Sequence, residues 1–108
     1  MTVKQLQQAT DLKALCLPEP EREFKGIYIG DLLSWVMGRA GEDNVWITIM
    51  SNINVVAVAS LADVSCVILA EGVTLASDVL ETAKQKGVNV LCSELPAYET
   101  AMAISGVV

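Results

Sequence analysis

The sequence contains no histidine, and this absence excludes a wide range of chemistry. Without an imidazole, the chain cannot form the Ser-His or Cys-His pairs that activate a nucleophile, or a metal site with histidine ligands. The three cysteines, Cys16, Cys66 and Cys92, are odd in number and far apart in the sequence. This spacing fits neither a disulfide framework nor a zinc ribbon, so we expect reduced thiols in a cytoplasmic protein.

Long uncharged apolar runs and clusters of basic residues are also missing. No stretch reaches the roughly 18 apolar residues of a membrane span without a polar interruption, and residues 1–5 lack the apolar segment of a secretory signal. Lys and Arg number 7 against 13 Asp and Glu, which gives a net charge of −6, and the basic residues are scattered. Because nucleic-acid binding needs a basic patch, we expect neither a membrane segment nor a nucleic-acid partner.

What is present is the composition of a small folded domain. The chain has 108 residues, of which 53% are hydrophobic and 19% are charged. These proportions argue against disorder, and the length suits one hydrophobic core. No internal repeat or linker divides the sequence, so we expect a single domain over residues 1–108.

Strand-like and helix-like segments alternate along this domain. Thr2 and Gln5 form a capping-box pattern that opens a short helix over 3–9, and 12–17 reads as a strand. The further predicted strands cover 26–30, 45–50, 65–69 and 88–92, and the further predicted helices cover 32–40, 53–62, 78–86 and 93–105. This alternation predicts a three-layer α/β/α fold with a small mixed, mostly parallel sheet, in which the N-terminal strand can run antiparallel.

The segment from Ile47 to Leu61 is apolar except for a polar knot at residues 51–54. The valines after the knot favour a strand. One strand over 45–61 would be far longer than the usual ~5–6 residues, and the strand at 65–69 needs a connection before it. Because Ser51 or Asn52 is a good N-cap, we predict that the strand ends near residue 50 and that a helix follows.

Polar residues at the starts of the other helices are predicted to cap them. Asp31 precedes the helix at 32–40, and Ser77 or Asp78 opens the helix at 78–86. The last helix opens at Ser93 or Glu94. Each of these side chains would accept a hydrogen bond from a free N–H group in the first helical turn.

A candidate binding site follows from the polar residues at the strand ends. Its members are Gly30, Asp31, Thr48, Ser51, Asn52, Asn54, Gly72 and Ser93. Around Asn52 a strand leads into a helix N-terminus, where free N–H groups and the helix dipole favour an anion or a polar ligand. Turns after neighbouring strands can line one crevice. The same residue types also serve as ordinary caps and turns, so both roles stay open.

The residues with catalytic potential do not form a recognisable set. Cys92 precedes the last helix, whose dipole could lower its pKa, but a buried inert thiol is the commoner role for cysteine. The 13 carboxylates show no spacing that singles out an acid/base pair. We therefore expect no catalytic residue, no metal and no cofactor.

The predicted helix at 32–40 is apolar on more than one side, which indicates burial or a partner. Trp35 and Met37 on this helix, together with Trp46 on the following strand, are the candidate contacts of a homodimer. Aromatic residues and methionine are enriched at protein interfaces, which supports this interpretation. Burial in the core of one protomer is the alternative.

Three segments resemble the DRTGG domain family, especially its small stand-alone members: IYIGDLLSWVMGRA, VWITIMSNINVVAVASLADVSCVILAEG and AKQKGVNVLCSELPAYETA. The motifs that carry the resemblance are the Gly30-Asp31 turn, the strand with Thr48 that turns at Asn52 into a helix, and the lead-in Lys86-Gly87-Val88. The resemblance covers nearly the whole chain. The five letters that name the family are absent, and MSNIN occupies the turn after the third strand.

The family is similar to the N-terminal domain of HPr kinase/phosphorylase, which implies a three-layer α/β fold and frequent homodimers. No Walker motif is present, so the kinase half of those enzymes has no counterpart in this sequence. Elsewhere such domains accompany CBS pairs in regulated pyrophosphatases, or lie inside phosphotransacetylase-like chains, in accessory roles. The resemblance therefore implies a non-enzymatic regulatory module.

Two hypotheses on function follow. In the first, a homodimer senses a small anionic metabolite, such as a nucleotide, at the strand ends near Asn52. In the second, the chain dimerises or docks on a metabolic enzyme or a kinase-like partner without binding a small molecule. Stabilisation by a ligand would separate the two, because a ligand that binds only the native state raises its stability.

Overall fold

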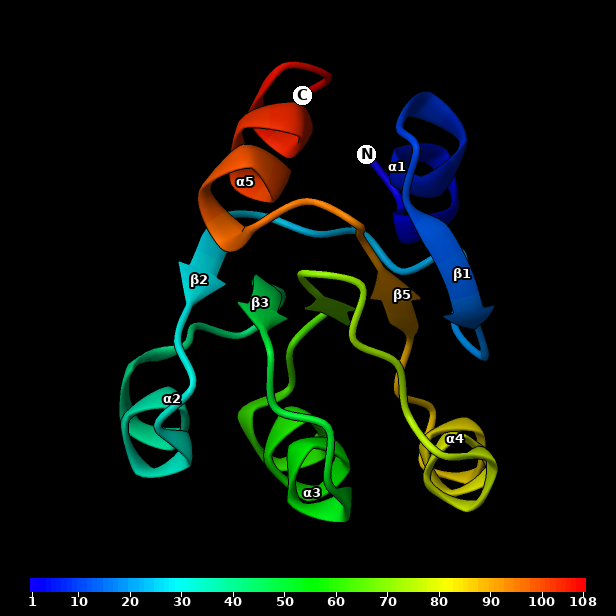
Figure 1. Cartoon of the computed structure of the whole chain (residues 1–108), viewed down its shortest axis with the longest axis vertical. Coiled ribbons are helices and arrows are strands. Elements are labelled where there is room, and N and C mark those ends of the chain that lie inside the picture. The colour runs from blue at the N-terminus through cyan, green and yellow to red at the C-terminus, as the bar shows by residue number, and fades with distance from the viewer.

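A five-stranded sheet lies between two layers of helices in the computed structural model, which describes residues 1–108 (Figure 1). The strands are β1 (Lys13–Cys16), β2 (Ile27–Ile29), β3 (Val45–Thr48), β4 (Cys66–Leu69) and β5 (Val90–Cys92). The helices are α1 (Val3–Ala9), α2 (Leu33–Arg39), α3 (Ile53–Ala62), α4 (Ser77–Gln85) and α5 (Ala97–Ser105). The predicted three-layer α/β/α architecture is confirmed.

The strand order across the sheet is β1-β5-β4-β3-β2. Strands β2 to β5 run parallel, and β1 pairs antiparallel with β5 at one edge. The predicted mixed, mostly parallel sheet is therefore confirmed. Because parallel strands end on the same side, the turns after β2, β3, β4 and β5 meet at one edge of the sheet, here called the carboxyl edge.

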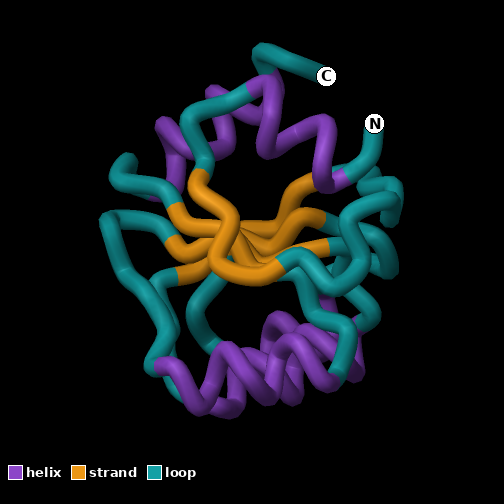
Figure 2. Tube along the Cα trace, turned by 90° about the vertical axis from the view of Figure 1, so that its right-hand side faces the viewer, coloured by secondary structure: helices purple, strands orange, loops and turns teal.

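Helices cover both faces of the sheet. Figures 1 and 2 show α1 and α5 on one face and α2, α3 and α4 on the other. Successive residues of β3 serve the two layers: Ile47 packs with Leu6 and Ile104 under α1 and α5, whereas Trp46 packs with Val56 above α3. Burial on both sides explains why β3 and β4 read as continuous apolar runs rather than as alternating ones. None of the helices is long and apolar enough to cross a membrane.

Two of the predicted caps are confirmed. The Thr2 side chain accepts from the Gln5 backbone N–H, and the Gln5 side chain accepts in return from the Thr2 N–H, which completes the capping box of α1. Asn52 is the N-cap of α3, because its Oδ1 accepts from the Asn54 N–H at 2.9 Å. The strand before α3 ends at Thr48, so the polar knot does turn the chain from strand to helix.

The other predicted caps are wrong. Helices α2, α4 and α5 begin after Leu32, Ala76 and Pro96, and none of these N-caps makes a side-chain hydrogen bond to the helix. The Asp31 and Ser93 side chains are engaged instead with other parts of the fold. Asp31 has been taken by a long-range contact with Thr48, and Ser93 by bonds to Leu95 and Thr100.

Candidate functional site

The turns at the carboxyl edge carry seven of the eight candidate residues, and Asn54 lies in the first turn of α3. These turns are Gly30 and Asp31 after β2, Thr48 to Asn52 at the end of β3, Gly72 after β4, and Ser93 after β5. The topology thus brings together residues that are as far apart in the sequence as Gly30 and Ser93. A candidate residue can bind a ligand only if its side chain is exposed and is not already hydrogen-bonded within the protein.

Asp31 joins the first two of these turns. Its Oδ1 accepts from the Thr48 hydroxyl at 2.8 Å and from the Ile49 backbone N–H at 3.0 Å. Thr48 is 1% exposed, and its Oγ1 also accepts from the Met50 N–H at 3.2 Å. These bonds fix the path of the chain between β3 and α3. Thr48 therefore has a structural role in the turn and presents no surface to a ligand.

The turn into α3 is the open part of the edge. Residues 51–54 are all exposed. The Asn52 Oδ1 accepts the hydrogen bond from the Asn54 N–H that caps α3. The Asn52 Nδ2 group and the side chains of Ser51 and Asn54 face solvent. This segment combines a helix N-terminus with free amide and hydroxyl groups, which is a polar surface rather than an enclosed pocket.

The remaining two turns are joined to each other. Gly72, with φ +73°, donates its N–H to the Ser93 carbonyl at 2.8 Å. Ser93 is buried, and its Oγ accepts from the Leu95 N–H at 3.1 Å and from the Thr100 hydroxyl at 2.8 Å. The Ser93 hydroxyl therefore points beneath α5 and away from the Asn52 turn.

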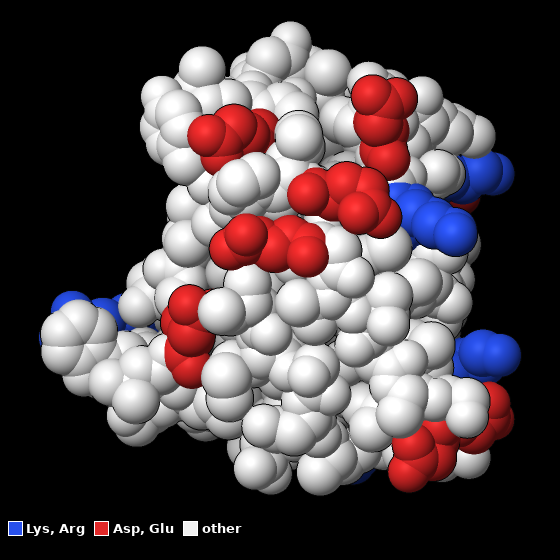
Figure 3. All heavy atoms as spheres, viewed as in Figure 1, with Lys and Arg blue, Asp and Glu red and all other residues white.

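Carboxylates dominate the charge of the carboxyl edge. Asp31, Glu71 and Glu94 each stand two residues after the end of a parallel strand. In Figure 3, acidic side chains spread over this face of the molecule, and basic side chains lie at its margins. A field of this sign attracts groups that donate hydrogen bonds or carry positive charge.

Two pockets lie next to α5. One has a volume of about 690 Å³ and is formed by residues 8–12 together with the turn after β5 and α5. The other, of about 580 Å³, lies between the ends of the chain, the segment 24–27 and the end of α5. Of the eight candidate residues, only Ser93 lines either pocket. The sequence did not predict the first pocket, because residues 8–12 were expected only as the end of a helix at 3–9 and the start of a strand at 12–17.

The cysteines lie in the layers of the core. Cys66 is fully buried, and burial raises the pKa of its thiol to about 12. Burial also raises the pKa values of Cys16 and Cys92 above the ordinary value. Each thiol is therefore protonated near neutral pH, whereas a cysteine nucleophile needs the thiolate. No group of three or more His, Cys, Asp or Glu side chains is close enough together to hold a metal ion.

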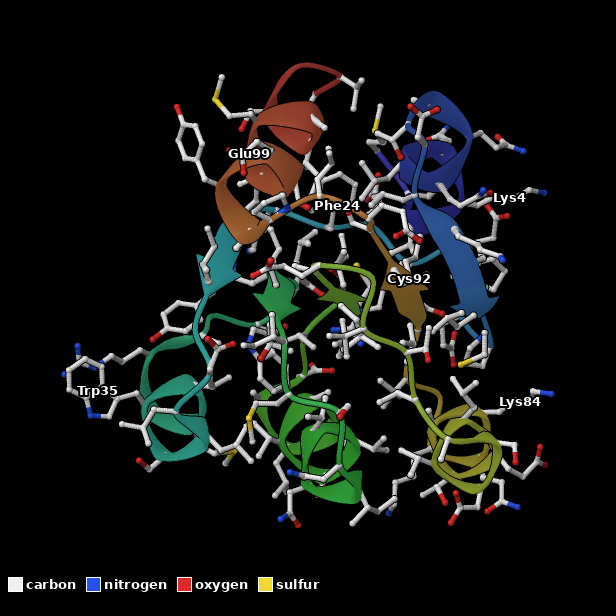
Figure 4. All side chains as sticks on the ribbon, in the orientation of Figure 1. Lys4, Phe24, Trp35, Lys84, Cys92 and Glu99 are labelled. Carbon is white, nitrogen blue, oxygen red and sulfur yellow. The ribbon has the colours of Figure 1, made fainter.

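The predicted interface residues occupy two different environments. Trp35 and Met37 are 53% and 42% exposed, and Trp35 points away from the molecule (Figure 4). Trp46 is 0% exposed, and its Nε1 donates to the Gly30 carbonyl at 2.9 Å. The prediction that Trp46 contributes to a dimer surface is wrong, because β3 lies inside the sheet with helices on both faces.

Comparison with known proteins agrees with this architecture. A family model for the DRTGG domain matches residues 8–107. A crystal structure of the CBS and DRTGG domains of the regulatory region of Clostridium perfringens pyrophosphatase, complexed with the activator diadenosine tetraphosphate, superposes with a TM-score of 0.74 at 15% sequence identity. The match covers 95% of this chain and 45% of that one, so this chain spans about half of that regulatory region. No curated protein matches the sequence. The chain belongs to the DRTGG domain family.

Proposed function

We propose that this chain is a non-catalytic regulatory module that acts by self-association through the outer face of α2. The observation that carries the proposal is the exposure of large apolar side chains on and next to this helix. Leu32 and Trp35, three residues apart on one side of the helix, are 59% and 53% exposed, Met37 on another side is 42% exposed, and α2 buries only Val36. A surface helix normally turns its apolar residues towards the core, so this arrangement is typical of a helix that packs on a partner.

The surroundings of α2 extend the apolar surface. Ile29 at the end of the edge strand β2 is 48% exposed, and Ile49 in the next turn is 46% exposed. The Ile49 N–H donates to Asp31, two residues before α2, so the two turns are adjacent. Strand β2 has a partner strand on one side only, and it carries no charged residue that would oppose pairing with another chain.

The charge of α2 favours a second copy of the same chain as the partner. The net charge is −6, so two copies repel each other overall. This repulsion opposes association least at a surface without carboxylates. Helix α2 has no acidic residue, and its one charged group, Arg39, lies 3.7 Å from the centroid of the Trp35 ring. A desolvated cation–π pair and a tryptophan are common components of interface hot spots. A metabolic enzyme or a kinase-like protein with a matching apolar patch is the alternative partner.

Trp35→Glu is expected to convert the protein from a dimer to a monomer of 11.5 kDa. The substitution removes an aromatic contact and places a carboxylate in the desolvated centre of the interface, so we expect the dissociation constant to rise by at least ~30-fold. Size-exclusion chromatography with multi-angle light scattering over a concentration series measures the mass directly.

Leu61→Glu is the matched control for this experiment. Leu61 is 73% exposed on α3, so the same chemical change is made on an apolar residue outside the proposed surface, and the dimer should persist. A wild-type protein that is monomeric at every concentration, or a Trp35→Glu variant with unchanged mass, would contradict the proposal of self-association.

A second candidate function is the sensing of a polar or phosphorylated metabolite at the carboxyl edge near Asn52. Two observations favour it. The exposed segment 51–54 offers free amide and hydroxyl groups at a helix N-terminus. The similar solved structure contains an activator, diadenosine tetraphosphate. The carboxylates of Asp31, Glu71 and Glu94 weaken the attraction of this edge for phosphate, which is why we place this function second.

Thermal unfolding with diadenosine tetraphosphate or mononucleotides tests the second candidate. If a nucleotide binds at this edge, a concentration of ~100 times Kd should stabilise the wild-type protein by ~2.7 kcal/mol. Asn52→Asp should abolish the effect, because it keeps a helix-capping oxygen but adds a negative charge next to the ligand. Equal stabilisation of Asn52→Asp and wild type would exclude Asn52 from the site, and no stabilisation by any nucleotide would leave self-association as the function.

A further inference from the structure

The free edge of β2 carries backbone groups that have no partner within the chain. The Gly26 carbonyl accepts from the Val45 N–H at 3.0 Å, and the Gly30 N–H donates to β3 at 3.2 Å, so residues 26 and 30 bond towards β3. Because alternate residues of a strand bond to the same side, the N–H and C=O groups of Ile27 and Ile29 point away from β3. Strand β2 is the last strand of the sheet, so these groups meet no other strand.

The opposite edge of the sheet is protected against pairing, whereas the β2 edge is not. Strand β1 begins with Lys13, and its register shifts between Ala14 and Cys16. A lysine and a bulge are two of the features by which proteins block pairing at an edge strand. Strand β2 has the sequence Ile-Tyr-Ile, a regular register with β3 and no charged residue. The β2 edge is therefore the one that can accept a further strand.

Exposed apolar side chains flank this edge on both faces of the sheet. On one face α2 lies beside β2, and Trp35 points away from the molecule on the same side (Figures 1 and 4). On the other face, Tyr98 and Met102 are exposed and lie four residues apart on one flank of α5. Ala103 on the other flank lines the pocket at the end of α1, so Tyr98 and Met102 face away from α1. A molecule bound at the β2 edge would cover these side chains.

We propose that the β2 strands of two copies pair antiparallel and join their two sheets into one continuous sheet. This inference rests on the proposed self-association and places its α2 contact beside the strand pair. A dimer closes around a two-fold axis, and an axis perpendicular to the sheet makes the paired strands antiparallel. Tyr28 then lies opposite Tyr28 of the second copy, and Ile27 lies opposite Ile29 of the second copy. Each pair of isoleucines exchanges two N–H···O=C bonds, so the free groups of the edge all find partners.

The charges at the two ends of β2 favour a second copy of the chain as the added strand. Lys25 is exposed two residues before β2, and Asp31 is exposed two residues after it. Antiparallel pairing brings the start of one strand to the end of the other, so Lys25 of each copy lies on the side of Asp31 of the other copy. These two symmetric attractions offset part of the repulsion between chains of net charge −6.

NMR of the full chain, as a mixture of ¹³C-labelled and unlabelled protein, tests the pairing directly. Opposite residues that share no hydrogen bond in an antiparallel pair have Cα atoms ~4.5 Å apart, so their Hα atoms are in contact. We expect an isotope-filtered NOE between Hα of Tyr28 in the labelled copy and Hα of Tyr28 in the unlabelled copy. The amide protons of Ile27 and Ile29 should exchange slowly in the dimer and rapidly on dilution. A dimer without these signals would overturn the strand pairing and leave association through α2 in place.

Ile29→Pro and Ile29→Val separate the backbone donor from the side chain. The Ile29 N–H points away from β3, so proline removes a donor of the dimer and no bond of the fold. We expect the dissociation constant of Ile29→Pro to rise by at least ~10-fold, and that of Ile29→Val to change by less than ~3-fold. Light scattering over a concentration series measures both. A folded Ile29→Pro variant that dimerises like wild type, together with a monomeric Trp35→Glu variant, would overturn only the strand pairing, whereas a wild-type monomer would overturn both proposals.

Lys25→Glu and Lys86→Glu test the antiparallel arrangement. Both substitutions change the net charge by the same amount, but Lys86 is exposed at the end of α4, on the side of the molecule away from β2 (Figure 1). At low salt, Lys25→Glu should raise the dissociation constant at least ~3-fold more than Lys86→Glu, because it faces Asp31 of the second copy with a like charge. The difference should disappear at high salt. Equal effects of the two variants at low salt would overturn the antiparallel arrangement.

Discussion

We expect that replacement of Asn89 by leucine lowers the free energy of unfolding by about 3 kcal/mol. Asn89 is 1% exposed, immediately before β5, and every polar atom of its carboxamide is used. Its Nδ2 donates to the Glu19 carbonyl at 2.8 Å and to the Ser65 carbonyl at 3.0 Å, and its Oδ1 accepts from the Glu19 N–H at 2.9 Å. Leucine has a similar volume but leaves the Ser65 carbonyl and the Glu19 N–H without a partner, whereas the Glu19 carbonyl still accepts from the Arg22 N–H at 3.2 Å.

The cost of this substitution comes from desolvation rather than from packing. The Ser65 carbonyl is buried at the start of β4, where it faces Asn89 before β5, whereas the groups of Glu19 can recover part of their hydration when the loop moves. Each unsatisfied buried group costs about 1–3 kcal/mol, so a total near 3 kcal/mol allows for this recovery. Loss of the bonds also loosens the segment 17–26 at Glu19, whereas Arg22 in its middle stays bound to Asp43 and Asp63.

Urea denaturation followed by circular dichroism measures this change. Asn54→Leu is the matched control, because Asn54 is exposed on α3 and its side chain makes no hydrogen bond within the protein, so its effect should stay within ~0.5 kcal/mol. A loss of less than ~1 kcal/mol for Asn89→Leu would show that water replaces the carboxamide and that the segment 17–26 is not anchored at this point.

The sequence carries most of the information on this fold because its signals are local. The strands β3 and β4 are continuous apolar runs, and the polar knot at 51–54 ends one of them and caps the next helix. The resulting alternation of strand and helix leaves few topologies, and the carboxyl edge follows directly from parallel pairing. The placement of the candidate residues at this edge could therefore be predicted, although their hydrogen-bond partners could not.

Two of the wrong cap predictions, those for Asp31 and Ser93, share one physical cause. A serine, an aspartate or a glutamate before a helix is a possible cap, but Asp31 binds Thr48 across two strands and Ser93 binds Thr100 beneath α5. Asn89 gave a detectable signal, since an amide next to a buried strand needs partners, but its partner Glu19 is 70 residues away. The pocket between α1 and α5 depends in the same way on segments that meet only in the folded chain.

Trp46→Ala is expected to destabilise the protein by about 4 kcal/mol, and Trp35→Ala by less than ~0.5 kcal/mol. The two tryptophans cannot be distinguished by residue type, and α2 is apolar on several sides, so its periodicity does not show which face is buried. In the structure Trp46 is fully buried in the cluster beneath α2 to α4, and its Nε1 bonds to Gly30. Its removal opens a cavity and leaves a carbonyl group without a partner.

Trp46→Ala is best made in the Trp35→Glu background, so that dissociation of a dimer does not add to the measured stability. Trp46→Ala in Trp35→Glu is then compared with Trp35→Ala and Trp35→Glu, all at a concentration where each is monomeric. Trp46→Phe separates the two contributions, because it keeps most of the buried ring and loses only the N–H donor, and we expect a loss of about 1–2 kcal/mol. Full stability of Trp46→Ala in the Trp35→Glu background, together with loss of the dimer when Trp46→Ala is made in the wild-type protein, would place Trp46 at the surface and overturn the packing of β3. We expect the opposite pattern. Stability should depend on Trp46, which is buried in the sheet, and association should depend on Trp35, which is exposed on α2.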